Sequence, residues 1–434
     1  MRPPTDTLPR VADLPAPYDN PLARELEADA LARFLRYVRV DTQSARESDT
    51  YPSTARQLDL SRMLEAELRE LGLPDVELTS DGYVFATLPG AEDGPTVGLV
   101  AHVDVSPDAP GAGVSPVVHE GYDGGELVAG LSPATSELLA ERVGHDVVTS
   151  DGTTLLGADD KAGVAQIMAA VAYLAAHPEI PRARARIAFT VDEEVGHGVD
   201  RFDLVRYGAD FAYTLDGDEV GLVQNETWSA IQLKVVFHGL GVHPGTAKGK
   251  LVNPVKLAAR FVDSLPRDTL SPETTEGREG FVHPTEIRGD AESATVTLIL
   301  RDFEWEPLEE HEALVRGLAE EAAAADPRAD VTFERWEQYR NMREALDRVP
   351  HVVEGALEAA RRVGLEPRLG SIRGGTDGSR LTELGLPTPN VFTGGNEYHS
   401  VREWISVQDL ALSAATVVEL IRVWAEPSWR RRAG

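Results

Sequence analysis

The sequence predicts an α/β protein: a larger domain with a mostly parallel central sheet, interrupted by a smaller α+β domain of ferredoxin-like order. Three observations support this fold class. The chain has 434 residues, which is too long for one ordinary hydrophobic core. Its first half alternates apolar strands with helical repeats, and this alternation resumes after residue 339. Between these parts, strands and helices follow in the order βαββαβ, which is typical of a ferredoxin-like domain.

The larger domain is predicted to begin with two helices, at residues 22–38 and 53–71, and leucines recur at helical spacing in the second. Residues 96–102 are continuously apolar, as expected of a central strand that is covered on both faces. The other predicted elements are strands at 76–78, 83–88, 184–190 and 211–215 and a helix at 163–176. Strands and helices that alternate in this way favour a parallel sheet.

The sequence pattern changes at about residue 228, where apolar residues begin to alternate with polar ones and indicate antiparallel strands. The predicted elements are strands at 231–237, 281–288, 294–300 and 330–335 and helices at 252–265 and 308–324. The predicted domain limits are a flexible N-terminal arm at 1–21, the larger domain at 22–227 and 339–434, and the inserted domain at 228–338. The arm lacks the apolar segment of a signal peptide.

The composition limits the classes of function. The chain contains no cysteine, so disulfides, thiol nucleophiles and cysteine–zinc sites are excluded, and histidine and carboxylate must hold any transition metal. The formal net charge of −30 argues against nucleic acids and anionic membranes as partners. This charge could favour a substrate with a free ammonium group, although a solubilising acidic surface explains most of it. No apolar stretch approaches the roughly 20 residues of a membrane span. The absence of cysteine fits a cytoplasmic location, which is the expected one.

Five acidic or histidine clusters lie at separate points of the chain, each at the end of an apolar run or in a glycine-rich turn. They are His102-Val103-Asp104, Asp159-Asp160, Asp192-Glu193-Glu194, Asp216 and His399. Together they provide two imidazoles, several carboxylates of which one can bridge, and a spare carboxylate to activate water. Two adjacent zinc ions need such a set. No single cluster identifies the chemistry, but the set indicates metal-assisted amide hydrolysis.

The first two clusters each leave an alternative open. Side chains two apart on a strand point the same way, so Asp104 can lie behind His102 and accept its second imidazole N–H. The alternative is a buried histidine that is hydrogen-bonded to the backbone. The position of His102 at the end of a strand favours a metal ligand instead. Asp159 and Asp160 precede a helix and could cap it. Capping accounts for one of the two acids, and the other could span two cations.

The remaining clusters contribute further carboxylates and the second imidazole. Asp192, Glu193 and Glu194 end an apolar strand, and three such acids repel one another unless a cation or a proton intervenes. If Glu194 binds metal, Glu193 projects differently and stays free as a general base. A solvated acidic turn is the alternative. Asp216 ends another strand at the edge of the predicted sheet, where ligands of open α/β sheets collect, and His399 lies in a glycine-rich loop.

Longer motifs surround these clusters. They are His102-Val103-Asp104, Leu156-Gly157-Ala158-Asp159-Asp160-Lys161-Ala162-Gly163, Asp192-Glu193-Glu194-Val195-Gly196, His243-Pro244-Gly245-Thr246-Ala247-Lys248-Gly249, Ile372-Arg373-Gly374-Gly375-Thr376-Asp377-Gly378 and Phe392-Thr393-Gly394-Gly395. The set resembles the peptidase T family, the tripeptide aminopeptidase branch of the aminoacylase/carboxypeptidase-like metallopeptidases. The family resemblance that these motifs carry covers about residues 31–425. The resemblance implies a catalytic α/β domain with an inserted lid domain.

The resemblance also implies a cofactor of two zinc ions per chain and a role for each cluster. The implied ligands are Asp159 as the bridge, His102 and Asp216 for one ion, and Glu194 and His399 for the other. Glu193 is implied as the general base, Asp104 as the acid that orients His102, and the peptide between Asp159 and Asp160 is expected to be cis. The implied reaction is attack by a metal-bridging hydroxide, whose proton Glu193 carries to the leaving amine.

Four further residues match substrate-binding positions of the family: His243 would polarise the scissile carbonyl, Arg301 would clamp the C-terminal carboxylate, and Asn341 and Arg373 would line the pocket. The expected partners are short peptides, chiefly tripeptides, with a homodimer as one possible assembly. A carboxypeptidase or N-acyl-amino-acid deacylase is the alternative activity, and a catalytically silent binding protein is a second. The segment at 222–229 and the loop with Glu397 and Ser400 depart from the family pattern and bear on substrate choice.

Overall fold

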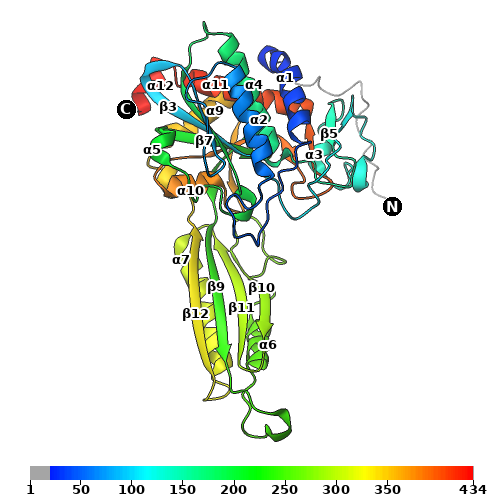
Figure 1. The fold of residues 1–434 in the computed structure, drawn as a ribbon, viewed down its shortest axis with the longest axis vertical. Helices are drawn as coiled ribbons and strands as arrows, with labels where there is room; N and C mark the ends of the chain where they lie inside the picture. The colour runs from blue at the N-terminus through cyan, green and yellow to red at the C-terminus, as the bar shows by residue number, and fades with distance from the viewer. Residues whose placement is uncertain (1–19, 434) are drawn as a thin grey trace, which may run out of the picture. The chain divides into compact units, whose positions relative to one another are not determined.

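The protein forms two compact units in a computed structural model that describes residues 20–433 (Figure 1). Among the described residues, the larger unit comprises residues 20–225, Glu344–Ser371 and residues 376–433, and the smaller one comprises Glu226–Arg343 and Ile372–Gly375. Almost all of the N-terminal arm predicted at residues 1–21 lies outside the described residues. The first described helix, α1 (Pro21–Tyr37), starts where the Asn20 side chain accepts a hydrogen bond from the N–H of Ala23.

The larger unit is built on an eight-stranded sheet of order β1-β2-β6-β3-β7-β14-β8-β13. Its central strands β6 (Ala183–Thr190), β3 (Ala91–His102), β7 (Phe211–Gly217) and β14 (Asn390–Phe392) pair in parallel. The remaining strands are β1 (Glu77–Leu78), β2 (Val84–Leu88), β8 (Leu222–Thr227) and β13 (Arg368–Ile372). Antiparallel pairing joins β1 to β2, β2 to β6 and β8 to β14. The predicted fold class, with a mostly parallel central sheet, is confirmed.

Two long helices, α4 (Ala158–Ala176) and α11 (Val407–Val423), pack on this sheet. α4 contacts β3 and β7, α11 contacts β6, and α1 packs against both helices. Alanines make up much of the buried surface of α4, which lets it lie close to its neighbours. Further helices are α2 (Gln57–Glu70), α3 (Glu137–Ala140), α5 (Leu204–Tyr207), α8 (Arg343–Leu346), α9 (Pro350–Arg362), α10 (Asp377–Glu383) and α12 (Pro427–Ala433).

The parallel strands bring three of the predicted clusters to one edge of the sheet. His102 is the last residue of β3 and lies in register with Thr190, the last residue of β6. The turn with Glu193 and Glu194 follows β6 directly, and Asp216 lies in the last part of β7. Since the carboxyl ends of parallel strands meet at the same edge, these side chains converge although they are far apart in the sequence.

A second, smaller sheet of the larger unit was not predicted from the sequence. Its strands, in the order β15-β16-β5-β4, are β4 (Val117–His119), β5 (Val147–Thr149), β15 (Gly395–Asn396) and β16 (Trp404–Ser406). All of its pairs are antiparallel. Trp404 is fully buried and anchors the small hydrophobic core beside this sheet. The sheet fixes both ends of the loop that carries His399.

The smaller unit has the predicted ferredoxin-like order. Its elements are β9 (Ser229–His238), α6 (Pro254–Ser264), β10 (Phe281–Gly289), β11 (Ser293–Asp302), α7 (Trp305–Ala323) and β12 (Asp330–Tyr339). The sheet order is β10-β11-β9-β12, and every pair is antiparallel. Residues of α6 and α7 share one hydrophobic core with the sheet. The segment Ile372–Gly375 joins this unit, and the Ile372 carbonyl accepts the N–H of Trp228 at 3.3 Å.

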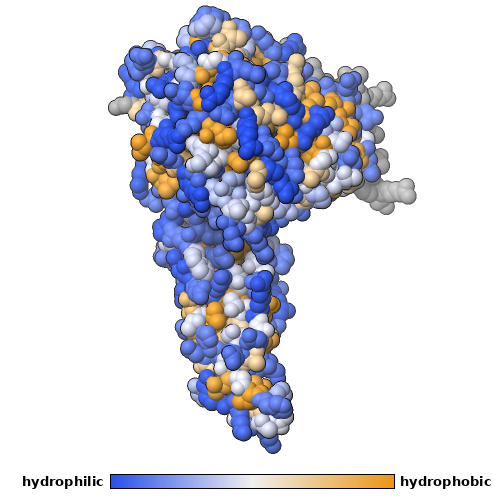
Figure 2. All heavy atoms as spheres, viewed as in Figure 1, coloured by the Kyte–Doolittle hydropathy of each residue, from blue (hydrophilic) through white to orange (hydrophobic). Residues whose placement is uncertain are grey.

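Polar residues cover most of the visible surface of the larger unit, with apolar residues scattered among them (Figure 2). Within residues 20–433, no helix is long and apolar enough to cross a membrane. The surface fits a chain in which 72 acidic residues exceed 42 basic ones.

Candidate metal and active site

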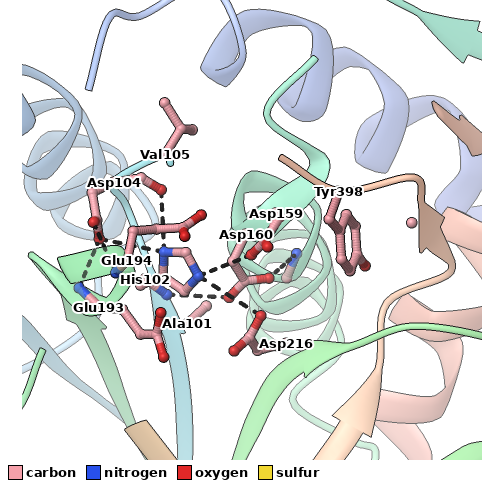
Figure 3. Close-up of polar contacts among 12 residues, drawn as sticks. Ala101, His102, Asp104, Val105, Asp159, Asp160, Glu193, Glu194, Asp216 and Tyr398 are labelled. Atoms are coloured by element: carbon pink, nitrogen blue, oxygen red, sulfur yellow. Dashed lines mark hydrogen bonds and ion pairs between the residues drawn. The ribbon is translucent and has the colours of Figure 1, made fainter. Parts of the chain in front are cut away.

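Two groups of three side chains in the larger unit have the composition and spacing of metal sites. In each group the potential ligand atoms all lie within 4.8 Å of one another. The first group is His102, Asp159 and Asp216, and the second is Asp159, Glu194 and His399. The structure therefore brings together all five residues that the sequence suggested as metal ligands, and the suggested bridge, Asp159, belongs to both groups. Figure 3 shows four of the five, His102, Asp159, Asp216 and Glu194.

His102 is held on both ring nitrogens. Its Nε2 lies 3.0 Å from Asp159 Oδ1 and 3.7 Å from Asp216 Oδ1. On the other side of the ring, Nδ1 lies 3.1 Å from the backbone oxygen of Asp104 and 3.3 Å from its carboxylate. An Nδ1–H that donates to these oxygens leaves Nε2 as the nitrogen with a free lone pair, which is the tautomer that a metal ligand needs.

Asp104 has a larger role than the sequence indicated. Its carboxylate is fully buried, and it accepts the N–H of Glu193 at 3.1 Å and the N–H of Glu194 at 3.2 Å. One side chain therefore orients the His102 ring and also fixes the turn that carries both glutamates. Asp192, the first acid of that turn, has a positive φ of 61°. Its carboxylate accepts a hydrogen bond from the Gln57 amide N–H, and its backbone N–H donates one to the Gln57 amide oxygen.

The two neighbouring acids at the start of α4, Asp159 and Asp160, have different roles. Asp160 is fully buried, and its carboxylate accepts the N–H of His102 at 3.1 Å and the N–H of Gly163 at 3.2 Å. It thus supplies the capping function that the sequence offered as an alternative. Asp159 instead points its carboxylate at His102 and His399. The peptide between the two aspartates is cis, as expected from the family resemblance.

The second group closes around His399. Its Nε2 lies 2.9 Å from Glu194 Oε2 and 3.2 Å from Asp159 Oδ2. The other oxygen of Glu194 is buried and has no hydrogen-bond partner. A buried carboxylate oxygen without a donor is costly, and a cation would satisfy it. Glu193 belongs to neither group, and no residue of the described chain is hydrogen-bonded to its carboxylate (Figure 3).

Crowding of carboxylates shifts the pKa values of this cluster. Burial and the charge of Asp159 raise the pKa of Asp216 to about 7 and that of Glu194 to about 8. Burial also raises the pKa of Glu193 well above its usual range. Burial lowers the pKa of His399, but its bonds to Asp159 and Glu194 outweigh this and raise it to about 11. Protons balance the negative charge here, and divalent cations bound by oxygen and imidazole nitrogen would replace them.

One buried acid next to this cluster was missed by the sequence analysis. Glu403 follows the His399 loop, and its carboxylate accepts the N–H groups of Leu156 at 2.8 Å, Gly157 at 2.6 Å and Asp159 at 2.9 Å. Burial raises its pKa to about 7. The only signal in the sequence is a glutamate directly before the apolar pair of Trp404 and Ile405.

The four predicted substrate residues all lie in the smaller unit. His243 is exposed, and its Nδ1 accepts the N–H of Gly245 at 3.1 Å. Arg301 is the second-last residue of β11, and its guanidinium lies 5.5 Å from the centre of the Tyr339 ring. No carboxylate among residues 20–433 forms an ion pair with Arg301.

Asn341 and Arg373 already make several contacts within the same unit. The Asn341 side chain accepts the N–H of Thr227 at 3.2 Å and donates to the Phe303 oxygen at 2.9 Å. The Arg373 guanidinium lies 4.8 Å from the centre of the Trp228 ring.

Comparison with known proteins agrees with this arrangement. The model of peptidase family M20/M25/M40 matches residues 147–423. A peptidase T from Exiguobacterium sp. is 46% identical over 409 residues, which cover 92% of this chain and 99% of the relative. This chain belongs to peptidase family M20/M25/M40. The predictions that it is an enzyme and that it resembles peptidase T are confirmed.

Solved structures of the family extend the comparison. Aminopeptidase PepT from Bacillus cereus superposes with a TM-score of 0.73 at 25% identity, covering 92% of this chain and 99% of that one. A dinuclear metal-binding M20 peptidase from Bacillus subtilis superposes with a TM-score of 0.64 at 16% identity, covering 92% of this chain and 98% of that one. The second match supports the fold only. The M20 family thus includes dinuclear peptidases, and the two ligand groups of this member share one aspartate.

Proposed function

We propose that this M20 peptidase is a cytoplasmic, zinc-dependent aminopeptidase that releases the N-terminal residue from tripeptides. One observation carries the proposal: Asp159 is shared by two groups of metal-ligand type, and the unbonded carboxylate of Glu193 lies beside them. The peptidase T and PepT names of its relatives support an aminopeptidase activity. The ligand sets contain imidazole and carboxylate but no sulfur, which suits two zinc ions.

The two zinc ions, when bound, would lower the pKa of water and polarise the scissile carbonyl. The first would be held by His102, Asp159 and Asp216, and the second by Asp159, Glu194 and His399. Glu193 acts as the general base: it takes the proton of the attacking water and passes it to the leaving amine. Burial raises its pKa, which makes the carboxylate a better proton acceptor, and a bound cation would favour the charged form that accepts the proton.

The smaller unit supplies groups that recognise the peptide, and we assign it the role of a lid. Since Nδ1 of His243 accepts a backbone N–H, the neutral ring carries its proton on Nε2. That N–H is exposed and suits donation to a developing oxyanion. The Arg301 guanidinium has no acidic partner within the described chain and suits a peptide carboxylate. Asn341 and Arg373 complete the proposed pocket.

A comparison of free and N-acetylated tripeptides, together with metal analysis, tests this proposal. An aminopeptidase cleaves free tripeptides between the first two residues and leaves the acetylated ones intact, and it contains two zinc ions per chain. Preferential cleavage of the acetylated peptides would replace the proposal with a deacylase. Release of the C-terminal residue would replace it with a carboxypeptidase. An inactive protein that retains both metals would contradict the enzyme assignment of Glu193.

A further inference from the structure

A buried glutamate connects the two chain segments that present Asp159 and His399. Glu403 lies four residues after His399, and its side chain reaches the backbone of the segment 156–159. Both carboxylate oxygens are used: Oε2 accepts the N–H of Leu156 and of Gly157, and Oε1 accepts the N–H of Asp159. Only 1% of Glu403 is exposed, so these hydrogen bonds form without competition from water.

The segment 156–159 depends on this carboxylate for its conformation. Leu156 and Gly157 are buried, lie outside the strands, and precede the helical part of α4. Gly157 has a positive φ of 83°. Buried N–H groups without a partner are costly, and bonds from N–H to a carboxylate are stronger than bonds between neutral groups. One side chain therefore satisfies the N–H of Asp159 and two N–H groups just before it.

The other end of the connection is rigid as well. Glu403 directly precedes β16, in which Trp404 pairs with Thr149 and Ile405 with Val148. The indole N–H of Trp404 donates to the Ser136 hydroxyl at 3.4 Å. The position of the Glu403 backbone is thus set by the smaller sheet of the larger unit, and the position of its carboxylate is set by the segment 156–159.

We propose that Glu403 is a positioning residue that fastens the segment of Asp159 to the loop of His399 and so fixes the spacing of two ligands in the second metal group. The first group contains His102 and Asp216, which β3 and β7 position independently of Glu403. Loss of the fastening therefore weakens the second site more than the first. The inference rests on the proposed dinuclear site, but the hydrogen bonds that carry it do not depend on metal.

The same loop offers a matched control. Glu397 forms an ion pair with Arg402 at 2.9 Å, and it has no hydrogen bond to the segment 156–159. Glu397→Gln therefore removes a carboxylate from the His399 loop and leaves the three N–H bonds of Glu403 intact. Glu403→Gln keeps the size of the side chain but replaces one accepting oxygen by an NH2 group, which leaves at least one buried N–H without an acceptor.

The first measurement uses the metal-free full-length proteins. Amide exchange at one or more of Leu156, Gly157 and Asp159 is expected to be about tenfold faster in Glu403→Gln than in the original chain, because the glutamine lacks one of the two accepting oxygens. Glu397→Gln is expected to leave these three rates unchanged. Equal rates in the original chain and Glu403→Gln would overturn the fastening, whatever the enzymatic activity proves to be.

The second measurement is a cobalt titration of the same proteins, followed through the visible spectrum and the shifted imidazole N–H resonances of His102 and His399. Glu403→Gln is expected to bind the ion at His399 about 10–100-fold more weakly, the usual cost of removing a residue that orients a ligand. The ion at His102 should be affected less. Equal weakening of both ions, or no weakening, would overturn the proposal.

Glu403→Asp is the second variant in case Glu403→Gln does not fold. It keeps the charge and both acceptor oxygens but withdraws them by one methylene group, so it is expected to fold. As in Glu403→Gln, binding of the ion at His399 should be weakened more than binding of the ion at His102. Unchanged binding of both ions by Glu403→Asp would overturn the proposal. An original chain that binds two cobalt ions but leaves tripeptides intact would contradict the proposed function, and the binding comparison would still decide the role of Glu403.

Discussion

The metal cluster of the larger unit and the substrate residues of the smaller unit differ in what holds their side chains. In the cluster, Asp159, Asp216 and Glu194 face one another and depend on protons or cations for their charge balance. In the smaller unit, Asn341 and Arg373 are hydrogen-bonded or packed on an aromatic ring. Carboxylates that repel one another need bound protons or a bound cation to stay together, so the cluster by itself points to a binding site. Side chains that already have partners in the protein could serve a structural role or a substrate-binding role, and only substitution separates these two roles.

The largest effect is expected at Glu193, which lies beside the cluster but outside both ligand groups. Glu193→Gln keeps the shape but cannot carry a proton, so kcat is expected to fall by about 10²–10⁴. Both metals and KM should change little. Kinetics of tripeptide hydrolysis and metal analysis of the same preparation measure these quantities. If the variant loses a metal, Glu193 is a ligand and the roles of the two glutamates are reversed.

Metal binding should depend strongly on pH. Without metal, the pKa of Asp216 is about 7, that of Glu194 about 8 and that of His399 about 11. These groups hold protons at neutral pH, and a metal must displace them. Lower pH therefore weakens binding, by about tenfold per pH unit for each proton displaced. Zinc titration calorimetry at pH 6 and pH 8, in buffers of different ionisation enthalpy, counts these protons. An affinity that does not change with pH would show that the metals displace no protons from Asp216, Glu194 or His399.

Arg301 is expected to have the largest effect among the substrate residues, because no acidic residue of the described chain pairs with it. A hydrogen bond to a charged group contributes about 1.5–3 kcal/mol. Arg301→Ala should therefore lower kcat/KM for tripeptides by about 10–100-fold. C-terminally amidated tripeptides lack the carboxylate and should lose much less. An equal loss on both substrates would make Arg301 a structural residue of the smaller unit.

The helices and strands whose apolar residues repeat with a clear period were predicted well from the sequence. The strand predicted at 294–300 is β11 (Ser293–Asp302), and the helix predicted at 252–265 is α6 (Pro254–Ser264). The smaller sheet of the larger unit was missed because its strands have only two or three residues, too few to show alternation. One of its strand pairs, β16 with β5, also joins residues about 250 positions apart, such as Trp404 and Thr149.

The candidate site could also be predicted only in part from local sequence patterns. His102 and Asp216 lie at the ends of parallel strands, and Asp159 lies at the start of a helix. The carboxyl edge of a parallel sheet gathers such residues, so their convergence could be predicted. Glu403 acts on backbone N–H groups, which no residue pattern records. The sequence also did not show which of Asp159 and Asp160 caps the helix and which one belongs to the metal-ligand groups. Two vicinal acids look equivalent until the direction of each side chain is known.

Arg373 is expected to have the smallest effect, and it sharpens the contrast with Arg301. Its guanidinium packs on the Trp228 ring at 4.8 Å, and a cation–π contact at an exposed site contributes about 0.5–1 kcal/mol. Arg373→Ala should therefore lower the free energy of unfolding by at most about 1 kcal/mol and raise KM only a few-fold. Arg288→Ala is the matched control, because it removes an exposed arginine from the same unit, where it pairs with Glu286. Denaturant unfolding and tripeptide kinetics compare the two variants. If Arg373→Ala also reduces the difference in kcat/KM between free and amidated tripeptides, Arg373 binds the peptide carboxylate together with Arg301. A residue that packs on an aromatic ring can then still belong to the substrate pocket.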